Sequence, residues 1–328
     1  PSPLWGGLGG ECFPVLWGKP AVRPCVLWPS KEAIRTMTTF NRDDIASRLS
    51  AAGYIADGEL ATAVSLMAFL KRPLLLEGEA GVGKTAVAAA LADLYDTKLI
   101  RLQCYEGLDQ SAALYEWNYQ RQLLAIQAHQ GRGAVEIEDE IFSEKYLLER
   151  PLLAAIRQAK APVLLIDEVD RADEEFEAFL LEVLSEFQVS IPELGTIPAI
   201  SVPHVVLTSN GTRELSDALR RRCLYHYLDY PDPDREARII MAHLTGIGAS
   251  LSLQIARMVE AIRKEDLRKV PGVAETLDWA AALVGLNLRD LHDSPEAVHQ
   301  TLLCLLKTRE DRSRVSREVT ERLLGRVA

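Results

Sequence analysis

One stretch of the sequence, "RPLLLEGEAGVGKTAVAAALADLY" from residue 72 to residue 95, constrains the fold more than any other. It begins with a short, continuous apolar run that ends in glycine, a pattern typical of a strand buried on both faces. It ends in an alanine- and leucine-rich run that is typical of a helix. Between the two lies GxxxxGK followed by threonine, and a strand, such a loop and a helix in this order predict a phosphate-binding loop.

The residues of this loop have different expected tasks. The glycines allow tight backbone turns, while the backbone amides and the helix N-terminus surround the phosphate groups. Lys84 is expected to reach the beta and gamma phosphate oxygens, and Thr85 is expected to be a magnesium ligand. The predicted nucleotide-binding residues are Gly78, Glu79, Ala80, Gly81, Val82, Gly83, Lys84 and Thr85.

Two further apolar runs end in polar side chains. "VLLIDE" places Asp167 and Glu168 at the carboxyl end of a buried strand, where ligands bind in open parallel sheets. We expect Asp167 to hold magnesium, mostly through its water shell, and Glu168 to polarise an attacking water molecule. "VVLTSN" ends in Asn210, which is placed either to orient water or the gamma phosphate, or only to form a turn before Gly211.

The pattern beyond these motifs predicts an α/β core followed by a helical lid. From about residue 57, apolar runs typical of strands alternate with helical patterns, which predicts a mostly parallel sheet covered by helices. After "PDPD" at 231–234 only helical patterns follow. The predicted domains are 37–230, the nucleotide-binding α/β core; 231–310, a smaller all-helical lid; and 311–328, a charged C-terminal helix or tail.

Residues 1–36 differ in composition from the rest of the chain. Six of the sixteen prolines and three of the five tryptophans lie there, without apolar periodicity. We expect this leader to be disordered or not native, with the native start at or near Met37. The alternative is an ordered N-terminal arm.

Two segments within the core are harder to interpret. Within 105–150, residues 115–129 predict a helix, and residues 133–140 alternate like a short strand. Residues 188–202 are typical of a hairpin with Gly195 in its turn. These segments are where contacts with a substrate or a partner are expected, and the alternative is that they are ordinary connections.

Composition narrows the function classes. A formal net charge of −10 and a sequence pI near 5.3 argue against broad nucleic-acid binding, which needs a basic face. No stretch approaches the run of about 18 to 20 apolar residues that a membrane span needs, and no basic segment leads into a short apolar signal, so we expect a cytoplasmic protein. The five cysteines are scattered, which indicates neither a disulfide framework nor a zinc site.

A phosphate loop, an acidic pair, a polar strand end, an arginine-rich segment and a helical lid, in this order, resemble the AAA+ ATPase superfamily over residues 42–310. "LLLEGEAGVGKT" and "LLIDEVDRADEEFEAFLLEVL", with the short hairpin before "VVLTSN", are most similar to the MoxR group. Within that group they resemble ATPases encoded beside carbon monoxide dehydrogenase and related molybdenum hydroxylases. The resemblance implies ATP and magnesium as cofactors and a homo-oligomeric ring, expected to be a hexamer.

The resemblance also implies an arginine that reaches the nucleotide of a neighbouring subunit. The matching position, just before the last strand of the core, is Arg222 in "SDALRRRCLYHY", and Arg221 is the next candidate. A cation placed where charge builds up on the transferring phosphoryl group lowers the barrier to hydrolysis. The alternative is a basic helix end that neutralises its own dipole, which explains one arginine better than three.

The lid departs from the family pattern. Members often carry an arginine at the start of a lid helix, but the corresponding stretch, "VPGVAETLDWAAAL", has Ala274 and Glu275 there. Lys269 and Arg268 are candidates to replace that arginine. The sequence leaves open which residue couples the nucleotide to the lid.

The resemblance implies an ATP-driven remodelling chaperone for a metalloenzyme client, such as a molybdenum hydroxylase, that works with a von Willebrand type A domain partner. The alternative is an AAA+ ATPase of nucleic-acid metabolism, a loader or a restriction-associated motor, which shares every motif above. No helix-turn-helix pattern follows the lid, and the net charge of −10 argues against nucleic acid as a partner. A GTPase would carry NKxD, which the sequence lacks, and a small-molecule kinase would not need the acidic pair together with a trans arginine.

Overall fold

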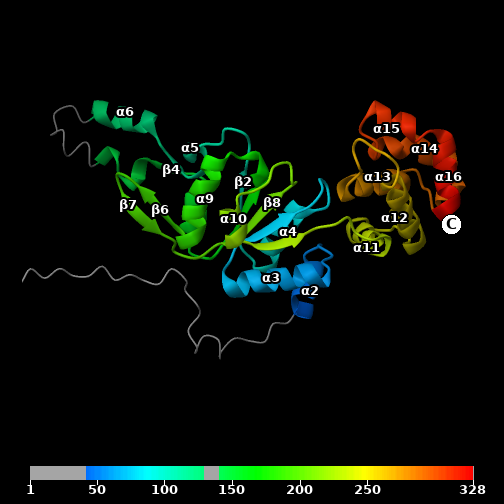
Figure 1. Ribbon diagram of the computed structural model, residues 1–328, viewed down its shortest axis with the longest axis horizontal. Coiled ribbons are helices and arrows are strands. Elements are labelled where there is room, and N and C mark those ends of the chain that lie inside the picture. The colour runs from blue at the N-terminus through cyan, green and yellow to red at the C-terminus, as the bar shows by residue number, and fades with distance from the viewer. Residues whose placement is uncertain (1–41, 129–139, 328) are drawn as a thin grey trace, which may run out of the picture. The chain divides into compact units, whose positions relative to one another are not determined.

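The computed structural model describes residues 42–128 and 140–327, and Figure 1 shows the elements that they form. The expected leader at 1–36, the expected start at Met37 and residues 133–139 of the expected short strand lie outside the described residues. A parallel sheet flanked by helices is followed along the chain by a region of helices and turns, which confirms the predicted fold class of an α/β core with a helical lid. In the part of the chain that is described, no helix combines the length and the apolar character needed to cross a membrane.

The central sheet has five parallel strands in the order β2-β5-β8-β1-β9. Strand β1 pairs with β8 on one side and with β9 on the other, in register from Leu74 to Glu77. The strands are β1 (Leu74–Glu77), β2 (Leu99–Gln103), β5 (Val163–Asp167), β8 (His204–Ser209) and β9 (Leu224–Tyr227). Because all five run in parallel, their carboxyl ends meet at one edge of the sheet.

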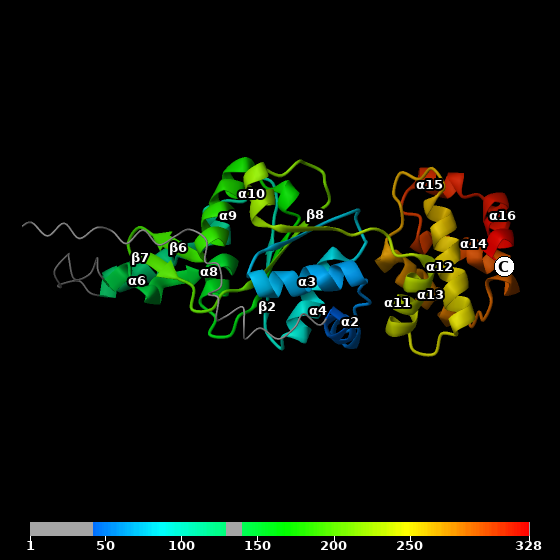
Figure 2. The same ribbon diagram turned by 60° about the horizontal axis from the view of Figure 1, so that its bottom comes forward.

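Side chains along the central strands alternate between two hydrophobic clusters, as expected for a sheet that is covered on both faces (Figure 2). In β5, Val163 and Leu165 belong to one cluster, whereas Leu164 and Ile166 belong to the other. The first cluster includes residues of α2 (Arg42–Ala51), α3 (Gly58–Leu70) and α4 (Lys84–Leu94), and the second includes residues of α8 (Pro151–Ile156), α9 (Glu174–Glu186) and α10 (Asp217–Arg222). Burial on both faces explains why these strands are continuous apolar runs.

The core also carries two small antiparallel pairs of strands. β3 (Tyr115–Trp117) pairs with β4 (Leu147–Glu149), and β6 (Gln188–Ile191) pairs with β7 (Gly195–Pro198). The predicted hairpin is confirmed, but its turn covers 192–194, and Gly195 is the first residue of β7. Gly195 has a φ of 80°, a left-handed conformation that glycine adopts without strain. Short helical turns at α5 (Gln110–Ala113), η1 (Glu144–Tyr146) and η2 (Val169–Arg171) complete the core.

The prediction of a helix over 115–129 is wrong for its first residues. Tyr115–Trp117 is strand β3, and helix α6 covers only Tyr119–Ala128. The Trp117 side chain is buried in the core, and Asn118 Oδ1 accepts a backbone hydrogen bond from the first turn of α6, as a helix-capping residue does. The aromatic residues therefore pack as a strand before the chain turns into the helix.

The helical region after the proline turn has a hydrophobic core of its own. Its elements are α11 (Pro233–His243), α12 (Ala249–Arg263), α13 (Val273–Gly285), η3 (Leu291–Asp293), α14 (Pro295–Thr301), η4 (Leu302–Cys304), α15 (Arg309–Arg314) and α16 (Arg317–Val327). Trp279 is fully buried among them, and its indole N–H donates to Thr301 Oγ1 at 2.9 Å. The last helix, α16, packs on α12 and α14 and buries Leu323 and Leu324, so the end of the chain contributes to this core.

Candidate nucleotide-binding and catalytic site

Three neighbouring strands of the sheet end beside the predicted phosphate loop. The loop follows β1, the acidic pair lies at the end of β5, and Asn210 follows β8. Residues 80–85, Asp167, Glu168 and Asn210 line a single cleft of about 580 Å³. The structure thus brings the predicted phosphate-binding, acidic and polar residues together, whereas 221–222 do not line this cleft.

The backbone of the phosphate loop requires glycine at particular positions. A Cβ atom on Gly78 would lie 2.3 Å from the Leu228 carbonyl oxygen, so only glycine fits between the end of β1 and the end of β9. Gly81 and Gly83 have φ angles of 82° and 97°, which lie in the left-handed region. These conformations turn the loop closely around the position that phosphate groups would occupy.

Lys84 lies on the inner side of the loop. Its ammonium group donates to the carbonyl oxygens of Gly78 and Glu79 at 2.6 and 2.8 Å, and the side chain is buried. Burial lowers the pKa of this ammonium group, while nearby carboxylates, that of Asp170 first among them, oppose the shift. A cation held against the loop backbone in this way is placed to bind phosphate oxygens.

The Asp167 carboxylate contacts side chains from three other elements of the core. It lies 3.2 Å from Thr85 Oγ1 on α4, and it accepts hydrogen bonds from Thr208 Oγ1 on β8 and Arg101 Nη2 on β2, both at 2.5 Å. The Asp167 residue is 3% exposed. Because the three partners come from three different elements, the carboxylate is fixed by the packing of the whole core.

Thr208 is a site residue that the sequence analysis missed. Besides donating to Asp167, its Oγ1 accepts a hydrogen bond from the Glu168 backbone N–H at 2.9 Å. Glu168 has a φ of 54° and a ψ of 50°, a left-handed conformation that is uncommon outside glycine, and this bond helps to hold it. The sequence offers one sign of this role: Thr208 precedes Asn210 by two residues in "VVLTSN", and residues two apart in a strand point to the same side.

Two further side chains hold the Glu168 carboxylate. Gln103 Nε2 donates to Glu168 Oε2 at 3.1 Å, and Arg171 Nε lies 2.9 Å from the same oxygen. The Glu168 side chain remains 30% exposed, so solvent reaches it, as a residue that polarises water requires. Sequence reasoning missed Gln103 because it comes from the neighbouring strand β2, and it missed Arg171 because an isolated arginine carries no signal.

Asp170 fixes the backbone that carries Asn210. Asp170 Oδ2 accepts hydrogen bonds from the backbone N–H groups of Asn210 and Thr212, at 3.2 and 3.0 Å, and from Thr212 Oγ1 at 2.6 Å. Burial acts to raise the pKa of Asp170, but the hydrogen bonds from Thr212 and Asn210 outweigh it and hold the pKa below its ordinary value. An ionised, buried carboxylate therefore holds the turn in which Asn210 faces the cleft.

The oxygen donors beside the loop fit magnesium. The Thr85 hydroxyl and the Asp167 carboxylate are hard oxygen ligands, and magnesium is usually bound by one or two such groups together with water and substrate phosphates. Across 42–128 and 140–327 no group of three or more His, Cys, Asp or Glu side chains could hold a metal ion. A magnesium site of this kind does not need such a group.

The three consecutive arginines of α10 lie in three different environments. Arg220 pairs with Glu77 at 3.5 Å, and Arg222 Nε donates to Ser185 Oγ on α9 at 2.7 Å. Arg221 is exposed, and its side chain has no hydrogen bond or ion pair within the described parts of the chain. None of the three arginines lines the cleft of its own chain.

The end of the cleft away from the acidic pair is more apolar. Tyr54 and Ile55 of the α2–α3 loop line it, together with Ile239 of α11 and Leu277 of α13. Burial raises the pKa of Tyr54 to about 12, so its phenol is neutral at ordinary pH. An apolar slot that continues a phosphate loop suits the base of a nucleotide.

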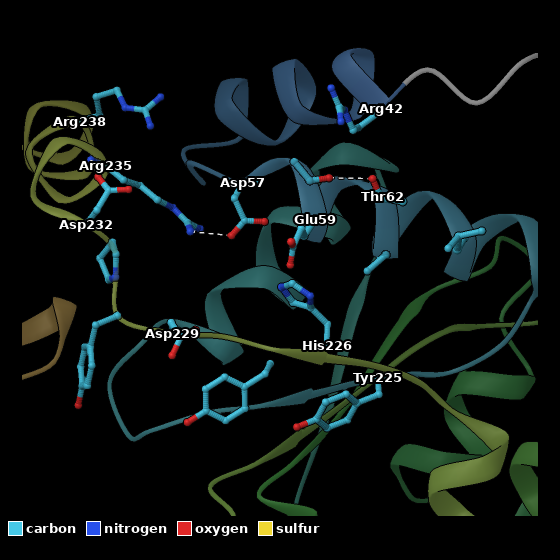
Figure 3. Close-up of a pocket in the computed structure, with 17 residues that line it drawn as sticks. Arg42, Asp57, Glu59, Thr62, Tyr225, His226, Asp229, Asp232, Arg235 and Arg238 are labelled. Atoms are coloured by element: carbon cyan, nitrogen blue, oxygen red, sulfur yellow. Dashed lines mark hydrogen bonds and ion pairs between the residues drawn. The ribbon is translucent and has the colours of Figure 1, made fainter.

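Arg235 ties the lid helix α11 to the α2–α3 loop, as Figure 3 shows. Its Nη1 pairs with Asp57 at 2.7 Å, and its Nε donates to the Ile55 carbonyl oxygen at 3.0 Å. Arg235 lines the cleft and also a second, neighbouring pocket of about 800 Å³. Asp229 and Pro231 line both pockets as well. The loop that forms the apolar end of the cleft is therefore held by the lid.

The lid residues considered in place of the missing arginine do not reach the cleft. Arg268 and Lys269 donate their backbone N–H groups to Asp311 at 2.7 and 3.3 Å, and neither lines the cleft. Ala274 lines the cleft without a polar group, and the Glu275 carboxylate accepts the N-cap N–H of its own helix at 3.1 Å. The first turn of α13 therefore presents no cation to the site.

Comparisons with known proteins give a family match and several distant relatives. Residues 73–223 match a family model described as an AAA domain of the dynein-related subfamily. Two uncharacterized proteins of Staphylococcus aureus, from a bovine strain and from strain COL, are each 28% identical over 231 residues, which cover 68% of this chain and 78% of the relative. The matched segment contains the phosphate loop, the acidic pair and the arginine triplet, and it supports an AAA+ ATPase.

Two solved structures resemble this chain with lower sequence identity than these relatives. A candidate ATPase from Cytophaga hutchinsonii has a TM-score of 0.43 and 17% identity, over 88% of this chain and 95% of that chain. The RuvB Holliday junction branch migration motor of Thermotoga maritima has a TM-score of 0.40 and 18% identity, over 80% of this chain and 68% of that chain.

We predict that Thr208→Val weakens magnesium-dependent nucleotide binding. Valine keeps the shape of the side chain but leaves the Asp167 carboxylate and the Glu168 N–H without this partner. A hydrogen bond to a charged group contributes about 1.5–3 kcal/mol, which corresponds to a rise of about tenfold or more in the magnesium concentration at half-saturation. Titration with magnesium in the presence of a fluorescent ATP analogue measures this concentration.

Thr208→Ser keeps the hydroxyl and should bind magnesium and nucleotide as the unaltered protein does. If the valine variant also binds them like the unaltered protein, Thr208 does not position Asp167 or Glu168.

Proposed function

We propose that this protein is a magnesium-dependent ATPase of the AAA+ type. The observation that carries the proposal is the cluster of Thr85, Asp167 and Thr208 beside the phosphate loop, with Glu168 next to it. The site thus contains a phosphate-binding loop, oxygen ligands that suit magnesium, and the Glu168 carboxylate, which water can reach. These are the parts that hydrolysis of a phosphoanhydride needs.

Each residue has a defined part in this reaction. The loop amides and Lys84 bind the phosphates. Thr85 and Asp167 would hold magnesium, which would supply positive charge that offsets the negative charge of the phosphate groups. Glu168 polarises the attacking water molecule, and Asn210 orients that water or the gamma phosphate. Gln103, Arg171 and Thr208 act through Glu168, because they hold its carboxylate and its backbone in place.

The proposal includes a homo-oligomeric ring, a hexamer by analogy with other AAA+ proteins. Its support is the position of Arg221 and Arg222 outside the cleft of their own subunit. The bonds from Arg222 Nε to Ser185 Oγ and from Nη1 to the Ala218 carbonyl oxygen set the direction of the guanidinium, and Nη2 has no hydrogen-bond partner among the described residues. An arginine so placed serves catalysis by entering the cleft of the next subunit, where it stabilises charge on the transferring phosphoryl group.

We further propose that the ATPase remodels a protein client in the cytoplasm, a metalloenzyme such as a molybdenum hydroxylase, with a von Willebrand type A domain protein as partner. The resemblance of the motifs to the MoxR group supports this client class. Exposed apolar side chains on α6 support a protein surface as the target, since Tyr119, Leu123 and Leu124 are 62%, 59% and 65% exposed. Apolar side chains gathered on one exposed helix are typical of protein contact sites.

Glu168→Gln is predicted to bind ATP with nearly unchanged affinity and to hydrolyse it at least about a hundredfold more slowly, because an amide cannot polarise water as a carboxylate does. Binding of a fluorescent ATP analogue and release of phosphate, both with magnesium, measure the two effects. Lys84→Ala is the comparison, and it should lose binding itself. Hydrolysis at the unaltered rate in the glutamine variant would remove Glu168 from its assigned role.

The glutamine variant also tests the client. We predict that Glu168→Gln, loaded with ATP, retains its client during affinity capture from the native host, because the trapped state does not release it. A molybdenum hydroxylase and a von Willebrand type A domain protein should be recovered, and Lys84→Ala should recover neither. Nucleic acid in place of these proteins would sink the client proposal and favour nucleic-acid metabolism, without affecting the ATPase assignment.

Arg222→Ala is predicted to suppress hydrolysis by about a thousandfold or more while leaving nucleotide binding unchanged. Mixing it with Glu168→Gln should restore part of the activity, because each variant supplies the side chain that the other lacks at a shared site. Arg221→Ala is the matched variant and should keep its activity. If only the Arg221 variant is inactive, the trans arginine is Arg221; if both variants hydrolyse ATP normally, no trans arginine exists in this triplet.

A further inference from the structure

The lid touches the phosphate loop backbone to backbone, at two glycines. A Cβ atom on Gly272, the residue before α13, would lie 2.6 Å from Gly81 Cα, and one on Gly81 would lie 2.8 Å from Gly272 Cα. The Val273 N–H, at the start of α13, donates to the Gly81 carbonyl oxygen at 2.8 Å. Neither glycine can carry a side chain unless the loop and the lid move apart.

Arg263 of α12 holds the residue that precedes this contact. Its Nε donates to the Pro271 carbonyl oxygen at 2.9 Å, and its Nη1 and Nη2 each donate to one carboxylate oxygen of Glu236 on α11 at 2.7 Å. The side chains of Arg263 and Glu236 are 7% and 0% exposed, and Thr276 Oγ1 lies 2.8 Å from the same carboxylate. The planar guanidinium therefore fixes Pro271 with respect to α11 and α13.

Two more contacts connect this guanidinium to the core. The Tyr230 ring, in the linker after β9, lies 4.5 Å from Arg263 Cζ, and the Tyr230 hydroxyl lies 3.5 Å from the Ala80 carbonyl oxygen in the phosphate loop. Beside Glu236 on α11, Arg235 bonds the α2–α3 loop. Arg263 is thus in contact with the linker, with α11 and with the start of α13, all of which border the cleft.

We propose that Arg263 is a positioning residue that couples the lid to the phosphate loop through Pro271, Gly272 and Val273. The inference rests on the proposed ATPase function, because the coupling acts through a nucleotide bound at the phosphate loop. Phosphate bound by the loop amides orders the Gly81 peptide, and the Val273 N–H transmits that order to α13. Arg263 sets the direction of the turn so that this bond forms. The coupling is reciprocal, so the lid contact raises nucleotide affinity by the same factor.

Gly272→Ala tests the contact directly. Gly272 has a φ of −87°, which alanine adopts freely, so only the approach to Gly81 changes. We expect nucleotide affinity to fall within the range of about 5- to 150-fold that is usual for coupled sites, and the amides of 271–274 to exchange hydrogen faster. Gly285→Ala, at the other end of α13, is the matched control: its Cβ would meet nothing within 4 Å, and it should behave as the unaltered protein.

Arg263→Lys tests the guanidinium. Lysine keeps a positive charge beside Glu236, but one ammonium group cannot bond both carboxylate oxygens and the Pro271 carbonyl in this planar arrangement. The same rise in exchange at 271–274 and the same loss of affinity are expected, with unchanged helical content by circular dichroism. If the lysine variant fails to fold, the alanine variant of Gly272 decides the question.

Unchanged affinity in Gly272→Ala would overturn the proposal, whether or not exchange at 271–274 rises, because a rise in exchange alone would make the contact purely structural. A loss of affinity in Gly285→Ala equal to that in Gly272→Ala would overturn it as well. If the unaltered protein binds ATP but does not hydrolyse it, the proposed function fails instead. The affinity and exchange comparison of the two glycine variants would still test the coupling in that case.

Discussion

The Asp167 carboxylate joins the parts of the molecule on which the site depends. It ends the buried strand β5, and its partners Arg101, Thr208 and Thr85 come from β2, β8 and α4. A buried carboxylate is costly without such partners, so the packing of the core and the geometry of the site are one problem. These contacts depend on the pairing register of β2 with β5, in which Gln103 lies opposite Asp167. A shift of one residue in β2 would turn its polar side chains to the other face of the sheet.

The positions of residues beside a locally defined strand could be predicted from the sequence, and contacts that depend on tertiary packing could not. The loop at 78–85 follows β1 and Asp167 ends β5, and each of these strands is indicated by the apolar residues next to it in the sequence. Thr208 and Arg101 meet Asp167 from 41 and 66 residues away, and nothing in either local pattern indicates that meeting. Strand β3 was missed for the same reason, since its partner β4 lies at 147–149.

The arginine triplet lies at a helix end that a residue from another part of the chain caps. Arg72 donates to the backbone carbonyl oxygens of Arg221 and Arg222, at 2.5 and 3.1 Å, and so caps the end of α10. Arg222 Nη1 also lies 3.4 Å from the Ala218 carbonyl oxygen of the same helix, so one arginine of the triplet does serve its own helix end. Arg220 turns to Glu77 at the end of β1. Arg222 bonds Ser185 Oγ and the Ala218 carbonyl oxygen, whereas the Arg221 side chain makes no hydrogen bond or ion pair within the described residues.

The ion pair inside the lid is better explained by position than by stability. Removing a guanidinium and a carboxylate from water costs several kcal/mol, and apolar side chains of similar volume in such places are often neutral or stabilising. Arg263 and Glu236 nevertheless lie buried beside the apolar core that surrounds Trp279. An apolar pair would fill that space equally well, but it could not bond the Pro271 carbonyl, so the turn that leads to Gly272 would lose its direction. Since that turn is where the lid meets the phosphate loop, the charged pair accounts for a contact that apolar packing alone leaves undefined.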